Sequence, residues 1–262
     1  MNNDIKKRRT HAMSTEKARE VKLAGHEAER EFANLIGGQI YPGTRKKDVI
    51  DSQNNIHSVK SGQKKWQIFL YGENRFRTSI GFLGAPYFLT CINSFPKNIK
   101  QYKINKTIFK KKLQTPMENL KKFLLAKEKN LFLHNNQLIF LQEAIFHSSE
   151  VDYLTIKEES IFHIFDAEEV IKIINNSVTL ENSKANQTGQ LNNQKVIFKL
   201  ISSHNTIGEI EMRNDSKVHY RQIKFWMDRK KTLQLLKEKI KPAKKKSNRI
   251  VTYGKSIKKF KI

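Results

Sequence analysis

Residues 47–60 of this chain read Lys-Asp-Val-Ile-Asp-Ser-Gln-Asn-Asn-Ile-His-Ser-Val-Lys. Two short apolar runs flank the polar residues 52–55, which are typical turn formers, so the segment predicts a β-hairpin. Asp48 begins the first run and Lys60 ends the second, twelve residues later. The hairpin therefore predicts an acid and a lysine on neighbouring strands.

The charge of the chain points to a polyanionic partner. Its 262 residues include 50 lysines and arginines against 25 acids, which gives a formal net charge of +25. Lysines and arginines placed on phosphates release condensed counterions, so this excess favours nucleic acid as the partner. Hydrophobic residues make up 38% of the chain, which is enough for a folded core.

Two further features of the composition narrow the class of protein. The sequence contains no apolar run of the roughly 20 residues that a membrane-spanning helix needs. Cys91 is the only cysteine, which excludes an internal disulfide and a cysteine-based zinc site. We therefore expect a cytoplasmic protein, with Cys91 in the core.

The pattern along the chain favours an α/β fold. A helix is expected from Ser14 to about Ile36, where Gly37-Gly38 ends it, followed by a strand near residues 39–41. A polar loop is expected at residues 182–194. The expected organisation is a basic arm (1–13), a core with insertions (14–181), a C-terminal part of the same domain (195–240) and a basic tail (241–262).

The sequence also predicts the secondary structure of several other segments. The run at residues 64–71 suits a strand or a helix, and we favour a helix because Ser61-Gly62 breaks the strand before it. The lysine-rich stretch at 97–122 is expected to break at Pro116. We further expect strands at residues 87–93, 161–165, 196–201 and 206–213, a helix capped by Asp166, and a long basic helix over residues 222–240.

Asp48 and Lys60 are suitable residues for phosphodiester chemistry. Hydrolysis of a phosphodiester commonly uses a hard cation such as Mg²⁺, which carboxylates bind, to polarise the phosphoryl oxygen and to acidify a water. A lysine beside the cation can orient the nucleophile and offset the charge of the transition state. The order of an acidic helix, Gly-Gly, a strand aspartate and a strand lysine strengthens this interpretation.

Three short motifs resemble those of the PD-(D/E)xK nuclease superfamily, and within it the type II restriction endonucleases of the Ser-x-Lys variant. They are Ala28-Glu29-Arg30-Glu31-Phe32, Lys47-Asp48-Val49-Ile50 and Ser58-Val59-Lys60, and the resemblance covers about residues 20–75. It implies a restriction-endonuclease-like core, a mixed β-sheet flanked by helices. It also implies that Asp48 is a metal ligand and that Lys60 positions the water.

The sequence departs from the family pattern at two positions. Lys47 stands where the family has proline, and Ser58 stands where it has the second acid. The resemblance implies that a glutamate elsewhere supplies the missing charge. Glu73, after the second strand, and Glu29, in the first helix, are the candidates for this ligand. Glu31 and Asp51 remain weaker alternatives to Glu29 and Asp48, respectively.

Basic and polar residues in two segments are candidates for DNA contacts. The first segment follows the hairpin, where arginines could clamp phosphates, and the second suits the reading of bases in a groove. The second segment could equally be a surface turn. The candidate residues are Arg75, Arg77, Arg213, Asn214, Lys217, His219 and Arg221. Glu209 and Glu211 form a Glu-x-Glu pair that we interpret as an exposed strand face.

The resemblance implies a Mg²⁺-dependent, sequence-specific endonuclease for double-stranded DNA, that is, a type II restriction enzyme. Members of the family often act as a homodimer on a palindromic site, and a monomeric nicking-type enzyme stays open; the resemblance also implies a cognate DNA methyltransferase in the same restriction-modification system. Two alternatives stay open at this point. One is a structure-selective DNA nuclease, such as a junction resolvase or a repair nuclease. The other is a non-catalytic nucleic-acid-binding protein.

Overall fold

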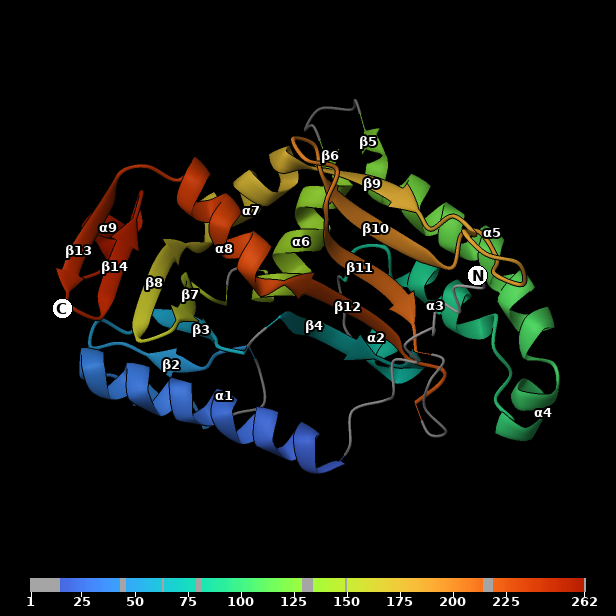
Figure 1. Ribbon diagram of the computed structural model, residues 1–262, viewed down its shortest axis with the longest axis horizontal. Coiled ribbons are helices and arrows are strands. Elements are labelled where there is room, and N and C mark those ends of the chain that lie inside the picture. Colours follow the sequence, from blue (N-terminus) through green and yellow to red (C-terminus); the bar gives the residue numbers. More distant parts are fainter. Residues whose placement is uncertain are drawn as a thin grey trace, which may run out of the picture.

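Two β-sheets and the helices around them make up the computed structural model, and the α/β class expected from the sequence is confirmed (Figure 1). The structure describes residues 15–42, 46–62, 64–78, 82–128, 134–148, 150–213 and 219–261. The expected basic arm, Asn214 and Lys217 lie outside these ranges. None of the helices in the described ranges has both the length and the apolar character needed to cross a membrane.

The first sheet is mixed and combines strands from distant parts of the chain. Its strands β3 and β7 are parallel, as are β8 and β14, and the other neighbours are antiparallel. In spatial order the strands are β1 (Gln39–Ile40), β2 (Val49–Ile50), β3 (Ile56–Lys60), β7 (Tyr153–Glu158), β8 (Ile161–Asp166), β14 (Ile250–Tyr253) and β13 (Ala243–Ser247).

The second sheet is antiparallel throughout and begins five residues after Lys60. In spatial order its strands are β4 (Lys65–Tyr71), β12 (Ile223–Asp228), β11 (Thr206–Met212), β10 (Lys195–Leu200) and β9 (Val178–Asn182). A separate two-stranded ribbon pairs β5 (Lys127–Glu128) with β6 (His134–Asn135).

Helices flank both sheets (Figure 1). The long helix α1 lies along the first sheet and contacts β1, β2 and β3, whereas α6 contacts β4 of the second sheet. The helices are α1 (Thr15–Ile36), α2 (Glu73–Thr78), α3 (Ala85–Asn93), α4 (Ile99–Ile104), α5 (Lys106–Leu125), α6 (Asn136–Phe146), α7 (Ala167–Ser177), α8 (Arg229–Lys239) and α9 (Ser256–Lys259).

Two hydrophobic clusters hold these layers together. The larger one joins the inner face of the second sheet to α3, α5, α6 and α7, and Phe140 and Phe225 are among its fully buried members. The smaller one lies between α1 and the first sheet, where Phe32 packs with Val59 and Phe162. Because apolar burial is the main favourable term in folding, the smaller cluster fixes the face of the hairpin that α1 covers.

Two glycines end α1, as the sequence predicts, and they allow it to lie close to the hairpin. Gly37 has φ +63°, the left-handed conformation that commonly follows a helix, and the Gly38 N–H donates to the carbonyl of Ala33 at 2.9 Å. A Cβ on Gly38 would lie 2.6 Å from the carbonyl oxygen of Ile50. A side chain at residue 38 would therefore push α1 away from β2.

The predictions for residues 64–71 and 87–93 are wrong. Residues 65–71 form the strand β4 and not a helix, because pairing with β12 lets Trp66 and Ile68 point into the core while Lys65 and Gln67 stay exposed. Residues 85–93 form the helix α3 and not a strand. Pro86 lies in its first turn, where no N–H is needed, and Phe88, Cys91 and Ile92 are buried at helical spacing. Cys91 is in the core, as expected.

Pro116 does not end the lysine-rich helix, because α5 runs from Lys106 to Leu125. The apolar face of α5, with Leu113, Met117 and Leu120, is buried on both sides of the proline, and this packing outweighs the lost backbone hydrogen bond.

The long basic helix expected over residues 222–240 is wrong for its first part, which forms a strand. Residues 223–228 form β12, and α8 begins only after Asp228, whose side chain accepts the backbone N–H of Lys231 at 3.1 Å. The expected strands near residues 196–201 and 206–213 and the Asp166 cap of α7 are confirmed.

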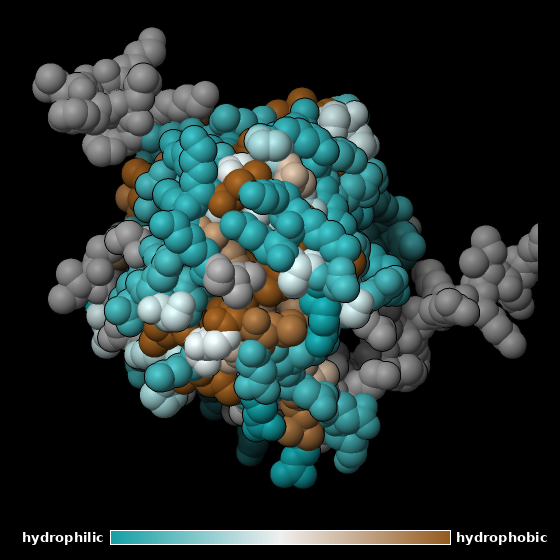
Figure 2. Space-filling view, turned by 90° about the vertical axis from the view of Figure 1, so that its left-hand side faces the viewer, coloured by the Kyte–Doolittle hydropathy of each residue, from teal (hydrophilic) through white to brown (hydrophobic). Residues whose placement is uncertain are grey.

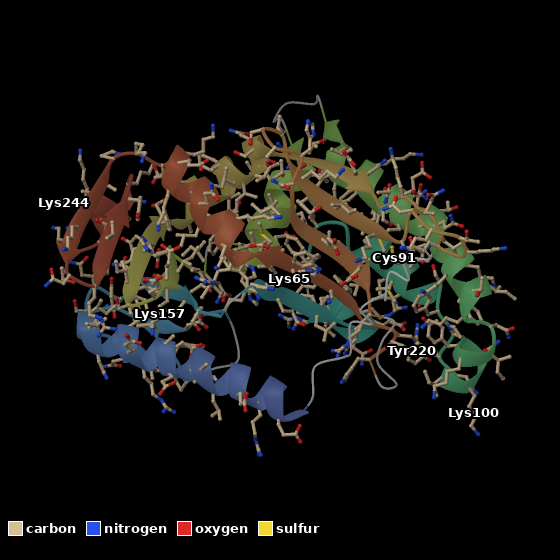
Figure 3. The ribbon with its side chains drawn as sticks, in the orientation of Figure 1. Lys65, Cys91, Lys100, Lys157, Tyr220 and Lys244 are labelled. Carbon is tan, nitrogen blue, oxygen red and sulfur yellow. The ribbon has the colours of Figure 1, made fainter. Side chains whose placement is uncertain are left out.

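The segment expected to be a basic tail folds into the first sheet as β13, β14 and α9. The lysines at residues 244–246 lie along the edge strand β13, and Lys244 is visible at this edge in Figure 3. Figure 2, which looks onto this end of the molecule, shows a largely hydrophilic surface with a few hydrophobic patches. Charged side chains on an edge strand discourage pairing with other chains.

The buried His163 predicts a pH-dependent stability. It is 4% exposed, its Nδ1 lies 2.9 Å from the Tyr253 hydroxyl, and burial, with Lys237 nearby, lowers its pKa to about 4. The unfolded state therefore takes up a proton first, and the folded protein loses up to about 3 kcal/mol of stability as the pH falls from 6.5 to 4.

Replacing His163 with glutamine should flatten this dependence, as measured by urea unfolding at several pH values. His26→Gln, at an exposed position of α1, is the control and should keep the wild-type slope. An unchanged slope in His163→Gln would refute this assignment.

Candidate active site at the open end of the hairpin

The register of β2 and β3 brings Asp48 and Lys60 together. Val49 pairs with His57 and Ile50 with Ile56, so the turn after Ile50 closes one end of the hairpin. Asp48, immediately before β2, donates its N–H to the carbonyl of His57 at 3.0 Å. The end of β3 therefore lies beside the start of β2, as the sequence predicts.

Asp48 and Lys60 lie on the same face of the sheet. Val59 packs in the cluster beneath α1, and side chains alternate along a strand, so Ser58 and Lys60 point to the opposite face. The Lys60 Nζ lies 2.8 Å from the Asp48 Oδ2. The Lys60 side chain is 24% exposed and the Asp48 side chain is 15% exposed. The pair is therefore partly shielded and still within reach of a substrate.

The Lys60 ammonium is held between two oxygens. Besides the Asp48 carboxylate, it donates to the carbonyl of Val59 at 3.1 Å. The same Asp48 Oδ2 accepts the N–H of Val59 at 2.7 Å and lies 3.3 Å from the Ser58 hydroxyl. The end of the hairpin thus places a carboxylate and a backbone carbonyl around one cation, and the Ser58 hydroxyl donates to that carboxylate.

Lys46 is a member of this site that the sequence analysis missed. Its ammonium donates to the carbonyl of Ala144 near the end of α6. Burial lowers the pKa of Lys46 well below its usual value, and Lys60 and Arg75 lower it further, whereas Asp48 opposes the shift. Lys46 belongs to a run of basic residues, 45–47, and only the fold shows that this one turns inward.

Arg75 acts electrostatically on Lys46. It lies in α2, with its guanidinium 5.3 Å from the centre of the Tyr71 ring, and its charge reaches Lys46. Its role as a phosphate contact stays a prediction.

Glu73 is bound elsewhere. Its carboxylate lies 2.9 Å from Arg77 and 3.1 Å from Arg221. The hydrogen bond from Arg77 and the charge of Arg221 hold the pKa of Glu73 below its usual value. Glu73 makes no hydrogen bond or ion pair with the Asp48 pair in the described part of the chain, so the structure does not bring this predicted ligand to the site.

The helix glutamates are bound to other partners as well. Glu29 accepts from the His26 ring at 3.0 Å. Glu31 pairs with Lys157 of β7 and with Arg249, which clamps α1 to the first sheet; Figure 3 shows Lys157 beside this helix. Neither glutamate contacts Asp48 among the residues that the structure describes.

Asp51, the weaker alternative to Asp48, lies at the other end of the hairpin. It is 5% exposed, and its Oδ2 is 3.6 Å from the Nε2 of the buried His57. Burial alone would raise its pKa, but the nearby His57 ring and the hydrogen bonds from Asn55 and Gln53 outweigh this and lower it to about 2. Asp51 therefore stabilises the turn and is separate from the Asp48 pair.

The structure brings together only some of the residues that were predicted to contact DNA. Arg221 bonds Glu73 and the Asn93 side chain, and Arg77 shares the same carboxylate. Arg213 follows β11, where its N–H donates to the carbonyl of Gln222 at 2.8 Å, and His219 precedes β12. These residues border one side of the second sheet.

Within the described ranges, no cluster of three or more histidine, cysteine, aspartate or glutamate side chains is placed to hold a metal ion. Glu209 and Glu211, the second acidic pair, are bound to Lys195 on the face of the second sheet, and Glu211 also binds Lys224. The side chains of Glu209 and Glu211 are 16% and 19% exposed, so this ion-paired strand face is half-buried and less exposed than expected.

No protein-family model, no curated protein and no solved structure matches this chain. The resemblance to the PD-(D/E)xK nucleases therefore rests on the residues of α1 and the hairpin alone.

Proposed function

We propose that this chain hydrolyses phosphodiester bonds of double-stranded DNA with Mg²⁺, as a sequence-specific type II restriction endonuclease. The observation that carries the proposal is the Lys60 ammonium, 2.8 Å from the Asp48 carboxylate at a partly exposed hairpin end. A carboxylate and an ammonium in this position are the groups that phosphodiester hydrolysis needs. The net charge of +25 supports DNA as the substrate.

The oxygens at this site fit a magnesium ion that keeps most of its waters. Asp48 and the carbonyl of Val59 already surround one cation, the Lys60 ammonium, and the Ser58 hydroxyl lies beside them. Mg²⁺ commonly binds through one or two carboxylates together with waters and substrate phosphates. When bound, such an ion polarises the phosphoryl oxygen and lowers the pKa of a water. Asp48 and the carbonyl of Val59 would hold it.

The residues of the chain supply the rest of the chemistry. Lys60 can donate to the attacking water and to a phosphate oxygen, which orients the nucleophile and offsets the negative charge that develops. The N–H of Val59 and the hydroxyl of Ser58 hold the Asp48 carboxylate in one orientation. The hairpin backbone therefore fixes the acid relative to the lysine before a substrate arrives.

The second sheet supports sequence recognition as part of the proposal. The hairpin and α1 end by residue 60, and five strands with their helices follow or pack beside them. A nuclease that reads its site needs such additional surface for base contacts. A homodimer on a palindromic site and a protecting methyltransferase belong to the same proposal.

Incubation of phage DNA with the protein and Mg²⁺ tests the proposal against its alternatives. Discrete fragments support a restriction endonuclease. A preference for branched DNA would replace the proposal with a structure-selective nuclease. Binding without cutting would replace it with a non-catalytic nucleic-acid-binding protein.

Asp48→Ala and Lys60→Ala should each lower the cleavage rate by about 10³-fold, because each removes a group that acts on the transition state. DNA affinity, measured without divalent cations, should stay close to wild type. Lys64→Ala, at an exposed lysine near the hairpin, is the charge-matched control and should cut normally. Wild-type turnover in either site variant would refute the assignment.

Glu73→Gln and Glu29→Gln test whether either glutamate acts as the second metal ligand. Glu73 is bound by two arginines and Glu29 by His26, so both variants should cut at nearly the wild-type rate. A fall of about 100-fold or more in one variant, measured by gel-based cleavage, would identify that glutamate as a ligand in the complex with DNA.

Ser58→Asp should strengthen metal binding. Ser58 is fully buried with its hydroxyl 3.3 Å from Asp48, so an aspartate there adds a second carboxylate beside the first. Without metal the like charges repel and lower the melting temperature. With Mg²⁺ the melting temperature should rise more than in wild type, corresponding to roughly tenfold tighter binding.

Ser52→Asp, in the turn at the opposite end of the hairpin, is the control for the added charge and should respond to Mg²⁺ as wild type does. An equal response in Ser58→Asp and Ser52→Asp would exclude a metal site at Asp48.

A further inference from the structure

The α4–α5 tip, which we define as residues 97–112, exposes two isoleucines. Ile104, the last residue of α4, is 81% exposed, more than any other large apolar side chain in the ranges that the structure describes. Ile108, in the first turn of α5, is 53% exposed. Single exposed apolar residues are common on protein surfaces, so the surroundings of these two decide whether they have a role.

Lysines flank the two isoleucines along the chain. The tip contains no acid, and the first acid that follows it is Glu118. Lysines three or four positions apart on a helix are neighbours and repel one another, so an anionic partner would stabilise them. All of the lysines of the tip are exposed except Lys110, which is half-buried. They are Lys97, Lys100, Lys103, Lys106, Lys110, Lys111 and Lys112.

Aromatic packing fixes the tip to the rest of the protein. Tyr102, in α4, is buried, and its ring centre lies 4.7 Å from that of Phe95 and 4.9 Å from that of Tyr220. The Tyr220 hydroxyl lies 2.6 Å from the carbonyl oxygen of Pro96 and 2.7 Å from that of Lys97. The exposed end of α4 therefore rests on a rigid support.

The tip is joined to a segment that the sequence marks as a candidate for DNA contacts. Tyr220 precedes Arg221, whose guanidinium donates to the Asn93 side chain at the end of α3 at 2.9 Å. In Figure 1, α4 lies at the end of the molecule opposite to β13, and Figure 3 shows Lys100 and Tyr220 at this end. The tip and the segment before β12 thus lie in one part of the molecule.

The packing of α5 argues against a lipid surface as the partner. An amphipathic helix that binds a membrane buries its apolar face among the lipids. The apolar face of α5, with Phe109, Leu113 and Met117, is already buried in the core of the protein. Duplex DNA suits the tip better. Its minor groove has phosphates on both sides, and an isoleucine flanked by basic residues can enter between two base pairs there.

We propose that the α4–α5 tip docks into the minor groove of duplex DNA, where Ile104 enters a base step and kinks the duplex while the flanking lysines bind the phosphates on either side. The inference rests on the proposed function for its choice of duplex DNA. Unstacking a base step costs free energy, and the phosphate contacts that the kink permits offset this cost. The tip therefore selects sequences that are easily deformed, without a hydrogen bond to a base.

Ile104→Ala tests the wedge, and Ile201→Ala, at a 55% exposed isoleucine after β10, is the matched control. Energy transfer between dyes at the two ends of a duplex of about 30 base pairs reports bending, in EDTA so that no cutting occurs. Wild type and Ile201→Ala should bend the duplex by about 20° or more. Ile104→Ala should leave it nearly straight and bind it about tenfold more weakly.

The melting temperature of Ile104→Ala should equal that of wild type, because the side chain lies on the surface. Equal bending by Ile104→Ala and Ile201→Ala would overturn the proposal.

Lys100→Ala tests the phosphate contacts through the salt dependence of binding. Its slope of log K against log salt should be smaller than that of wild type by about 0.9, the value for one phosphate contact. Lys172→Ala, at an exposed lysine on α7 near the acidic Glu168 and Glu169, is the charge-matched control and should keep the wild-type slope. Equal slopes in the two variants would contradict the docking of the tip on DNA.

Binding to vesicles that contain phosphatidylserine distinguishes DNA from a lipid surface. Wild type and Ile104→Ala should bind these vesicles equally. Vesicle binding that Ile104→Ala loses, with DNA bending unchanged, would replace DNA with a membrane as the partner of the tip.

Failure of the wedge and failure of the nuclease can be told apart. A wild type that cuts DNA while Ile104→Ala bends the duplex as it does disproves the wedge alone. A wild type that bends DNA through Ile104 but never cuts it disproves the nuclease and keeps the wedge. A wild type that binds no DNA disproves both.

Discussion

The contact of one Asp48 oxygen with the N–H of Val59 and the ammonium of Lys60 is the constraint on which the site depends. It exists only in the observed register of β2 and β3, because a slip by one residue would turn the side chains of one strand to the other face. The smaller hydrophobic cluster prevents such a slip, since Val49 and Val59 must both stay beneath α1. The packing that holds the helix therefore also aims the acid and the lysine.

The surroundings of this contact come from segments that are far away in the sequence. The carbonyl that binds Lys46 belongs to Ala144, 98 residues later, and Arg75 comes from the helix that follows β4. The second sheet and α6 share the larger cluster, so they hold these groups against the hairpin as one packed unit. A hairpin alone would give the carboxylate and ammonium but not the excess of positive charge.

The local signals that predicted the hairpin were strong ones. The turn residues 52–55 and the flanking apolar runs predicted β3 with the bounds Ile56–Lys60, and Gly37 predicted the end of α1. Residues 64–71 and 87–93 failed because short apolar runs suit a strand or a helix equally well, and only the pairing with β12 or the packing of α3 decides. Glu73 lies in the first turn of α2, but its partner Arg221 is 148 residues away, and no local pattern reports such a partner.

The core beneath the hairpin also contains Phe260, whose ring centre lies 5.3 Å from that of His57. These two residues are about 200 positions apart, and at 5–20 residues per second a ribosome needs roughly 10–40 s to add the intervening chain. During that time one side of β3 lacks part of its cover. The order of translation thus delays the complete packing of the strand that carries Lys60 until almost all of this sequence has been made.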